Sequence, residues 1–174
     1  MIEGAEFGEL FARFTDSAFR LETLENYREP HERDAIRRFV TGRPPDDSWA
    51  GDYVRLLRRL QAGGRRIERV RVLSRPLTTY QRFVMDLAAR CTVPAGEDLR
   101  VLDQSHAETI GLSLGTDFWL FDDRLAALMH FEGGAFTGAE LIDDSAEIGR
   151  LRALRQIAWK AARLDRLEDF AVYR

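Results

Sequence analysis

Seven polar residues lie where an apolar, branched run ends and a helical pattern begins. They are Arg71, Ser74, Arg75, Thr78, Thr79, Tyr80 and Arg82. In an open α/β sheet, ligands bind outside the strand ends, where helix N-termini offer unpaired backbone N–H groups. Guanidinium groups bind phosphate in a bidentate manner. The segment therefore predicts a site for an anionic ligand. In the alternative interpretation, Ser74 and Thr78 only cap the helix and Tyr80 packs.

Three aspartates, Asp117, Asp122 and Asp123, form the other group that could do chemistry. Neighbouring carboxylates can act in acid–base catalysis or bind magnesium. Asp122 and Asp123 also suit the tip of a hairpin, because aspartate tolerates the backbone angles of a tight turn, and we favour this interpretation. Asp117 and Asp122 join Arg71, Ser74, Arg75, Thr79, Tyr80 and Arg82 as the candidate ligand-binding residues.

Other reactive residues form no familiar catalytic or metal-binding motif. His31, His106 and His130 fall in three different predicted elements, without a carboxylate partner at helical spacing. Cys91 lies at a predicted helix end among small apolar residues, where a buried structural role is common. We therefore expect no catalytic residue, no metal and no cofactor, and an enzyme is the less favoured class.

The segment 55–75 is dense in arginine. It contains Arg55, Arg58, Arg59, Arg65, Arg66, Arg69, Arg71 and Arg75. These cations either form a phosphate-binding face or are solvated, with Glu68 and the acidic N-terminal segment as counter-charges, and we favour the solvated interpretation. The formal net charge of −3 and the pI of about 5.7 do not favour direct binding to nucleic acid.

The composition predicts a soluble cytoplasmic protein. The chain has 174 residues, 45% hydrophobic and 32% charged, and its one cysteine excludes an internal disulfide. The N-terminal sequence MIEGAEFGELFARF lacks the basic region of a signal peptide, and no run reaches the ~18 apolar residues of a membrane span.

Apolar periodicity predicts alternating helices and strands. Helices are expected over residues 6–15, 30–41, 48–62, 78–91 and 145–161. Strands are expected over residues 17–27, 67–73, 97–103, 118–121, 125–131 and 135–142. Residues 104–116 are expected to be a loop, and the tail LEDFAVYR a loose end or docking segment.

This order predicts an α/β fold, with a mixed β-sheet flanked by helices and an N-terminal helical segment. We expect one domain over residues 1–174, in which residues 1–62 are mainly helical and residues 65–165 form the sheet-containing core.

Three phrases carry a family resemblance: RVRVLSRPLTTYQRF, AGEDLRVL and DFWLFDDRLAALMHFEGGAFTGAELIDD. They resemble an uncharacterised actinobacterial family of domains of unknown function, over most of the chain from Phe14 to the last predicted helix. Members are often encoded beside small helix-turn-helix regulators. The resemblance therefore implies a regulatory role with such a regulator as partner.

A more distant resemblance is to the phospholipase D-like fold, whose strand, turn and strand before a long helix carry a His-x-Lys-x4-Asp signature. Aligning its aspartate on Asp123 places Thr116 and Phe118 at the histidine and lysine positions, and aligning it on Asp122 places Gly115 and Asp117 there. Both catalytic residues are missing, so this resemblance implies a fold that has lost its catalysis.

Three functions follow as hypotheses, in order of preference. The first is a non-catalytic regulatory protein that works with a helix-turn-helix transcriptional regulator. The second is a small-molecule sensor for an anionic ligand, and the third a divergent phosphodiesterase. A homodimer is compatible with each of them.

Overall fold

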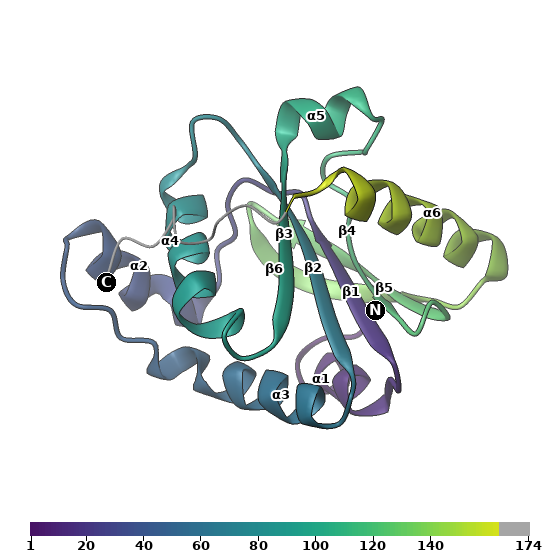
Figure 1. Cartoon of the computed structure of the whole chain (residues 1–174), viewed down its shortest axis with the longest axis horizontal. Coiled ribbons are helices and arrows are strands. Elements are labelled where there is room, and N and C mark those ends of the chain that lie inside the picture. Colours follow the sequence, from purple (N-terminus) through teal and green to yellow (C-terminus); the bar gives the residue numbers. More distant parts are fainter. Residues whose placement is uncertain (164–174) are drawn as a thin grey trace.

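The computed structural model describes residues 1–163 of the chain, as one sheet with helices on both faces (Figure 1). The strands are β1 (Ser17–Glu22), β2 (Arg66–Leu73), β3 (Glu97–Asp103), β4 (Asp117–Phe121), β5 (Leu125–Glu132) and β6 (Ala135–Ile142). The helices are α1 (Gly4–Arg13), α2 (Arg33–Val40), α3 (Gly51–Ala62), α4 (Thr79–Leu87), α5 (Gln104–Thr109) and α6 (Ser145–Ala161). The expected α/β fold with a mixed, helix-flanked sheet is confirmed.

The strand order is β3-β2-β1-β4-β5-β6. β1, β2 and β3 run parallel, whereas β4, β5 and β6 follow one another in antiparallel hairpins. β1 therefore joins the parallel half to the antiparallel half. Although it comes from the mainly helical N-terminal part of the chain, it lies in the middle of the sheet.

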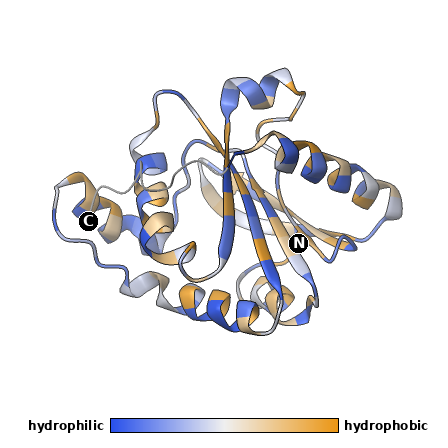
Figure 2. Ribbon diagram, viewed as in Figure 1, coloured by the Kyte–Doolittle hydropathy of each residue, from blue (hydrophilic) through white to orange (hydrophobic). Residues whose placement is uncertain are grey.

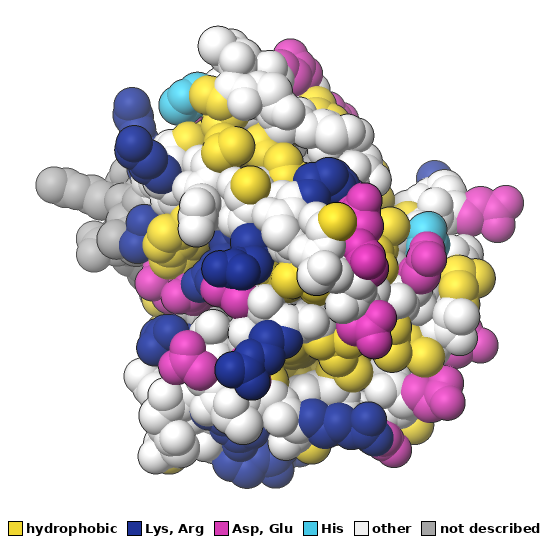
Figure 3. Space-filling view, turned by 90° about the vertical axis from the view of Figure 1, so that its right-hand side faces the viewer, with side chains coloured by type: hydrophobic (Ala, Val, Ile, Leu, Met, Phe, Trp, Pro, Cys, Tyr) yellow, Lys and Arg dark blue, Asp and Glu magenta, His cyan; other side chains and the backbone are white. Residues whose placement is uncertain are grey.

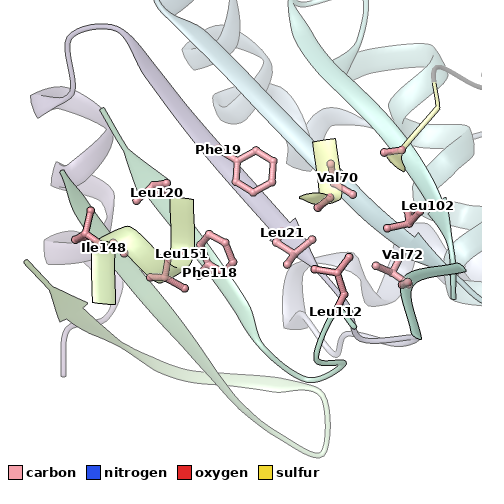
Figure 4. Close-up of a cluster of buried hydrophobic side chains, with 14 residues drawn as sticks. Phe19, Leu21, Val70, Val72, Leu102, Leu112, Phe118, Leu120, Ile148 and Leu151 are labelled. Atoms are coloured by element: carbon pink, nitrogen blue, oxygen red, sulfur yellow. The ribbon is translucent and has the colours of Figure 1, made fainter. Parts of the chain in front are cut away.

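One face of the sheet is apolar and packs against α6. Because successive side chains of a strand point to opposite faces, Phe19 and Leu21 of β1 lie on the same side as Phe118 and Leu120 of β4. All four are buried in one cluster with Leu151 of α6 (Figure 4).

The opposite face is covered by α1, α3 and α4 (Figure 1). Phe11 of α1 and Leu57 of α3 pack on Trp119 and neighbouring strand residues, and Met85 of α4 packs on Leu99. These helices carry both hydrophilic and hydrophobic residues along their length, as expected for amphipathic helices that each bury one side (Figure 2). Among the described helices, none is long and apolar enough to cross a membrane.

Two expectations about local structure were wrong. The strand expected over residues 17–27 ends at Glu22, because the backbone N–H and hydroxyl of Thr23 donate to the carboxylate of Asp117 instead of continuing the sheet. The expected loop over residues 104–116 contains the short helix α5, which packs Ala107 in the apolar cluster beside Leu112. A helix of six residues has too few turns to show an apolar period.

Both outer strands make a single β-bridge to a segment near a chain end. Ile2 bridges to Ala139 of β6, and Arg163 bridges to Val101 of β3, each through a pair of backbone hydrogen bonds of 2.8 to 2.9 Å. The tail expected to be a loose end or docking segment lies outside the described residues.

Candidate functional site

A cavity of about 640 Å³ lies between the sheet and the helices α1, α3 and α4. Its floor is formed by strand residues, most of them charged, and its walls are largely aromatic. The aromatic residues that line it are Phe7, Tyr27, His31, Trp49, Tyr53, Tyr80, Phe131 and Phe136. A volume of this size is typical of small-molecule sites.

The charged floor results from strand alternation. In β1, Arg20 and Glu22 alternate with the apolar residues of the α6 face, so both point into the cavity. In β2, Arg69 and Arg71 do the same, and the register places them opposite Arg20 and Glu22 respectively. Glu97 of β3 completes the floor.

Glu22 is the centre of the ion-pair network on this floor. Its carboxylate pairs with Arg69 and Arg71, and lies 3.6 Å from Nε of Arg20. Burial alone would raise the pKa of Glu22, but the charges of these three arginines outweigh it and lower the pKa to about 2. Glu22 is therefore ionised at neutral pH.

Arg69 is held from a second side by Glu97 and Tyr53. Its Nε donates to Glu97 at 2.8 Å and its Nη2 donates to the Tyr53 hydroxyl at 2.9 Å, while Tyr53 itself donates to Glu97 at 2.9 Å. The other oxygen of Glu97 accepts a 2.6 Å hydrogen bond from Thr92. These contacts hold both partners of the Arg69–Glu97 ion pair in place on the cavity floor.

Asp117, only 1% exposed, supports the floor from the end of β4. It accepts hydrogen bonds from Nη2 of Arg20 at 3.1 Å, from Thr23, and from the hydroxyl of Tyr27. Burial and the nearby carboxylates of Glu22 and Asp117 raise the pKa of Tyr27 far above its ordinary value. Tyr27 therefore remains a protonated donor.

Apart from Oε2 of Glu22, which is ion-paired with Arg71, four polar atoms in the lining have no hydrogen-bond partner within residues 1–163. They are Nη1 of Arg20, Nε of Arg71, Nε1 of Trp49 and Oε2 of Glu32, all buried. An unsatisfied buried donor or acceptor costs about 1–3 kcal/mol, and native proteins contain few of them. Their concentration around one cavity indicates that groups from outside the chain complete these hydrogen bonds.

Glu32 lies in the short 3-10 turn η1 (Pro30–Glu32) and is 7% exposed. Burial raises the pKa of its carboxyl to about 7, against the opposing effects of a hydrogen bond with Tyr80 and the charge of Arg71. Its protonation therefore changes near neutral pH.

The structure places only some of the candidate residues predicted from the sequence at the cavity. Arg71 and Tyr80 line the cavity, and Asp117 supports it. Asp122 lies at the other end of β4, where its carboxylate accepts backbone N–H bonds from Thr15, Asp16 and Ser17.

The other four candidates form contacts around the start of α4. Ser74 binds Gln81, Arg75 pairs with Asp103 at 2.7 Å, and Arg82 donates to the hydroxyl of Thr79. Thr78 caps α4 through reciprocal hydrogen bonds with Gln81, each of 3.1 Å. These contacts have a local structural role and lie outside the cavity lining.

Sequence reasoning missed most of the cavity. The missed residues are Arg20, Glu22, Tyr27, Glu32, Trp49, Tyr53, Arg69 and Glu97. The solvated interpretation of the arginine segment fits the exposed Arg55, Arg66 and Arg75, but was wrong for Arg69 and Arg71, which are largely buried. The sequence feature that could have indicated them is the alternation of charged and apolar residues in FRLE and ERVRV. This alternation is equally consistent with charged residues that face solvent and with charged residues that helices cover.

Among the described residues, no three His, Cys, Asp or Glu side chains are grouped so that they could hold a metal ion. Burial raises the pKa of Cys91 to about 11, which disfavours the reactive thiolate. On the molecular face in Figure 3, basic and acidic side chains are interspersed. The cavity, with its aromatic walls and charged floor, has the size and polarity of a small-molecule site.

Comparison with protein-family models matches residues 5–171 to one family, described as Domain of unknown function (DUF6879). This match covers nearly the whole chain and confirms the resemblance to an uncharacterised family. Comparison with curated proteins finds no match.

Proposed function

We propose that this chain, which belongs to the DUF6879 family, is a sensor that binds a small organic molecule in the cavity between the sheet and α1, α3 and α4. The main support for this proposal is that four buried polar atoms around the 640 Å³ cavity have no hydrogen-bond partner among residues 1–163. A ligand supplying complementary donors and acceptors would remove the cost of leaving them unpaired.

The ion-pair network also supports ligand binding. Buried ion pairs add little net stability, because their desolvation cancels much of their attraction. The floor nevertheless holds Arg20, Arg69 and Arg71 in fixed geometry against Glu22, Glu97 and Asp117. Such preorganised polar groups contribute to specificity, since their positions are set before the ligand arrives.

The proposed test is a thermal-shift screen with a library of metabolites. A ligand at 100 times its Kd adds about 2.7 kcal/mol to the free energy of unfolding, which raises the Tm by roughly 5–10 °C for a chain of this size. The matched variants are Ala88→Phe, which adds a ring at a buried position of the cavity lining, and Ala153→Phe, which adds the same side chain on the exposed surface of α6.

We expect a related group of compounds to raise the Tm of the wild type and of Ala153→Phe, but not that of Ala88→Phe. Equal shifts in all three proteins, or no shift in any of them, would contradict ligand binding in the cavity. Native mass spectrometry of the wild type with each compound checks the stoichiometry.

The two other functions stay predictions. Partnership with a helix-turn-helix regulator rests on the family resemblance, and it is compatible with a sensor, whose ligand could change that partnership. The phospholipase D-like fold and a divergent phosphodiesterase also stay predictions. The chain's one lysine, Lys160, is in α6, on the opposite side of the sheet from the cavity.

A further inference from the structure

The formal charges around the cavity leave an excess of carboxylates. On the floor, three arginines face three carboxylates, those of Glu22, Glu97 and Asp117, so their charges cancel. Three further carboxylates, those of Glu29, Glu32 and Asp52, also line the cavity, and Asp52 pairs with Arg55. The floor arginines are therefore already neutralised, and the remaining acidic groups favour a positively charged ligand group.

Glu32 is the best placed of these carboxylates to bind such a group. It is more than nine-tenths buried, it lines the cavity, and its Oε2 is unpartnered within the described part of the chain. Trp49 and Tyr80 line the same cavity, and aromatic faces attract cations. A carboxylate beside aromatic rings is a common environment for an organic ammonium group.

The unpartnered donors place a second requirement on the ligand. Nη1 of Arg20 and Nε of Arg71 each need an acceptor atom. Because carboxylates on the floor already balance the charges of both arginines, a neutral carbonyl, hydroxyl or ether oxygen is sufficient. An anionic group on the ligand would instead be repelled by the excess of carboxylates around the cavity.

We infer that the ligand of the proposed sensor carries a positively charged nitrogen that pairs with Glu32, and neutral oxygen acceptors that bind Arg20 and Arg71. This inference rests on the proposed function and gives its ligand a chemical class, an oxygenated organic amine. It departs from the anionic ligand predicted from the sequence.

Three probes with a common phenylalkyl skeleton test the charge preference: phenylethylamine, phenylethanol and phenylpropionate. Ligand-detected NMR measures the binding of each to the wild type, to Ala88→Phe, to Glu32→Gln and to the exposed control Glu147→Gln on α6. Glu32→Gln keeps the shape of the side chain and removes its charge. We expect the amine to bind most strongly to the wild type and the control, and at least tenfold more weakly to Glu32→Gln and Ala88→Phe.

The pH dependence gives a second readout. Glu32 faces Arg71 from β2, Glu22 from β1, Tyr80 from α4 and Glu29 from its own turn. With its pKa near 7, the ionised fraction of Glu32 rises about tenfold between about pH 6 and about pH 8, while an alkylamine stays protonated. Amine affinity should therefore rise about tenfold over this range in the wild type and stay constant in Glu32→Gln.

The outcomes separate the inference from the proposed function. If phenylpropionate binds the wild type more strongly than the amine does, and Ala88→Phe abolishes this binding, then the cavity binds ligands but the inferred ligand class, an organic amine, is wrong. The same conclusion follows if amine binding is unchanged in Glu32→Gln. If none of the probes binds the wild type better than Ala88→Phe, the result counts against both.

Discussion

The two faces of the sheet use the same strands for different purposes. Toward α6, the central strands present Phe19, Leu21, Phe118 and Leu120, which form a closely packed apolar layer. Toward α1, α3 and α4, β1 and β2 present Arg20, Glu22, Arg69 and Arg71 around a cavity, beside an apolar cluster that contains Trp119 of β4. Adjacent residues of a strand therefore point to different parts of the molecule: one to the apolar layer that stabilises the fold, the next to the cavity suited to recognition.

Energetics explain the division. Apolar burial contributes roughly 25 cal/mol per Å² and depends little on the orientation of the groups. A buried ion-pair network adds little net stability but is costly to break, because the remaining partner stays buried and unpaired. We therefore expect substitutions on the two faces to behave differently.

The largest expected effect is on the apolar face. Phe118→Ala should lower the free energy of unfolding by about 4 kcal/mol, because it removes a fully buried ring from the layer beneath α6. Chemical denaturation measures the loss, and Phe118→Leu, which keeps most of the volume, serves as the control. Equal losses in the two variants would contradict a close-packed layer.

The next largest effect distinguishes the charged face. Asp117→Asn should cost about 3 kcal/mol, because Arg20 loses the closer of its two buried carboxylate partners, the other being Glu22. Adding Arg20→Met should recover at least about 1 kcal/mol of this loss, since no unpaired guanidinium then remains. Urea denaturation of the two single variants and the double variant gives the coupling energy. Strict additivity would show that the ion pair does not act as a unit.

A pH-dependent effect of about 2–3 kcal/mol is expected at Glu32. Its pKa is raised from 4.5 to about 7 in the folded protein, so the folded state holds this proton more tightly than the unfolded state. The associated stability is present below about pH 4.5 and is lost as the pH rises through about 7.

Glu32→Gln should therefore be more stable than the wild type above about pH 7, with a difference that shrinks toward about pH 4.5. Thermal unfolding across this pH range, without ligand, measures the difference. A constant difference at every pH would show that Glu32 does not titrate as inferred.

The smallest effect should come from Asp122, which lies away from both faces. Asp122→Ala should cost about 1–2 kcal/mol, through lost hydrogen bonds to the N–H groups of residues 15–17 and through strain at its positive φ of 50°. Binding of any cavity ligand should be unchanged. If calorimetry shows that Asp122→Ala changes ligand affinity, Asp122 contributes to the binding site after all.

The fold was more predictable than the site because apolar periodicity reflects local structure. Every strand of the described residues and their five longer helices were predicted, from apolar residues at a period of two or near 3.6 and, for β4, from a continuous apolar run. The position of Tyr80 at the start of a helix and of Arg71 in a strand also followed from local patterns. The location of the cavity did not.

The cavity depends on tertiary packing. The sequence around Arg20 and Arg69 does not show whether helices cover that side of the strands, and α1 comes from a segment far from both β2 and β4. The loop residue Glu32 and the helical residue Trp49 reach the site only because η1 and the turn before α3 lie over the sheet. No local pattern in the sequence specifies that arrangement.

The bridges made by Ile2 and Arg163 restrict how two copies of this chain could associate. Exposed outer strands are the usual route by which sheets of separate molecules join edge to edge. Here backbone groups of Ala139 in β6 and of Val101 in β3 are already paired, so a second molecule could not add a continuous strand along either edge without displacing that pairing. If a homodimer forms, we expect it to use helix surfaces and to leave each sheet six strands wide.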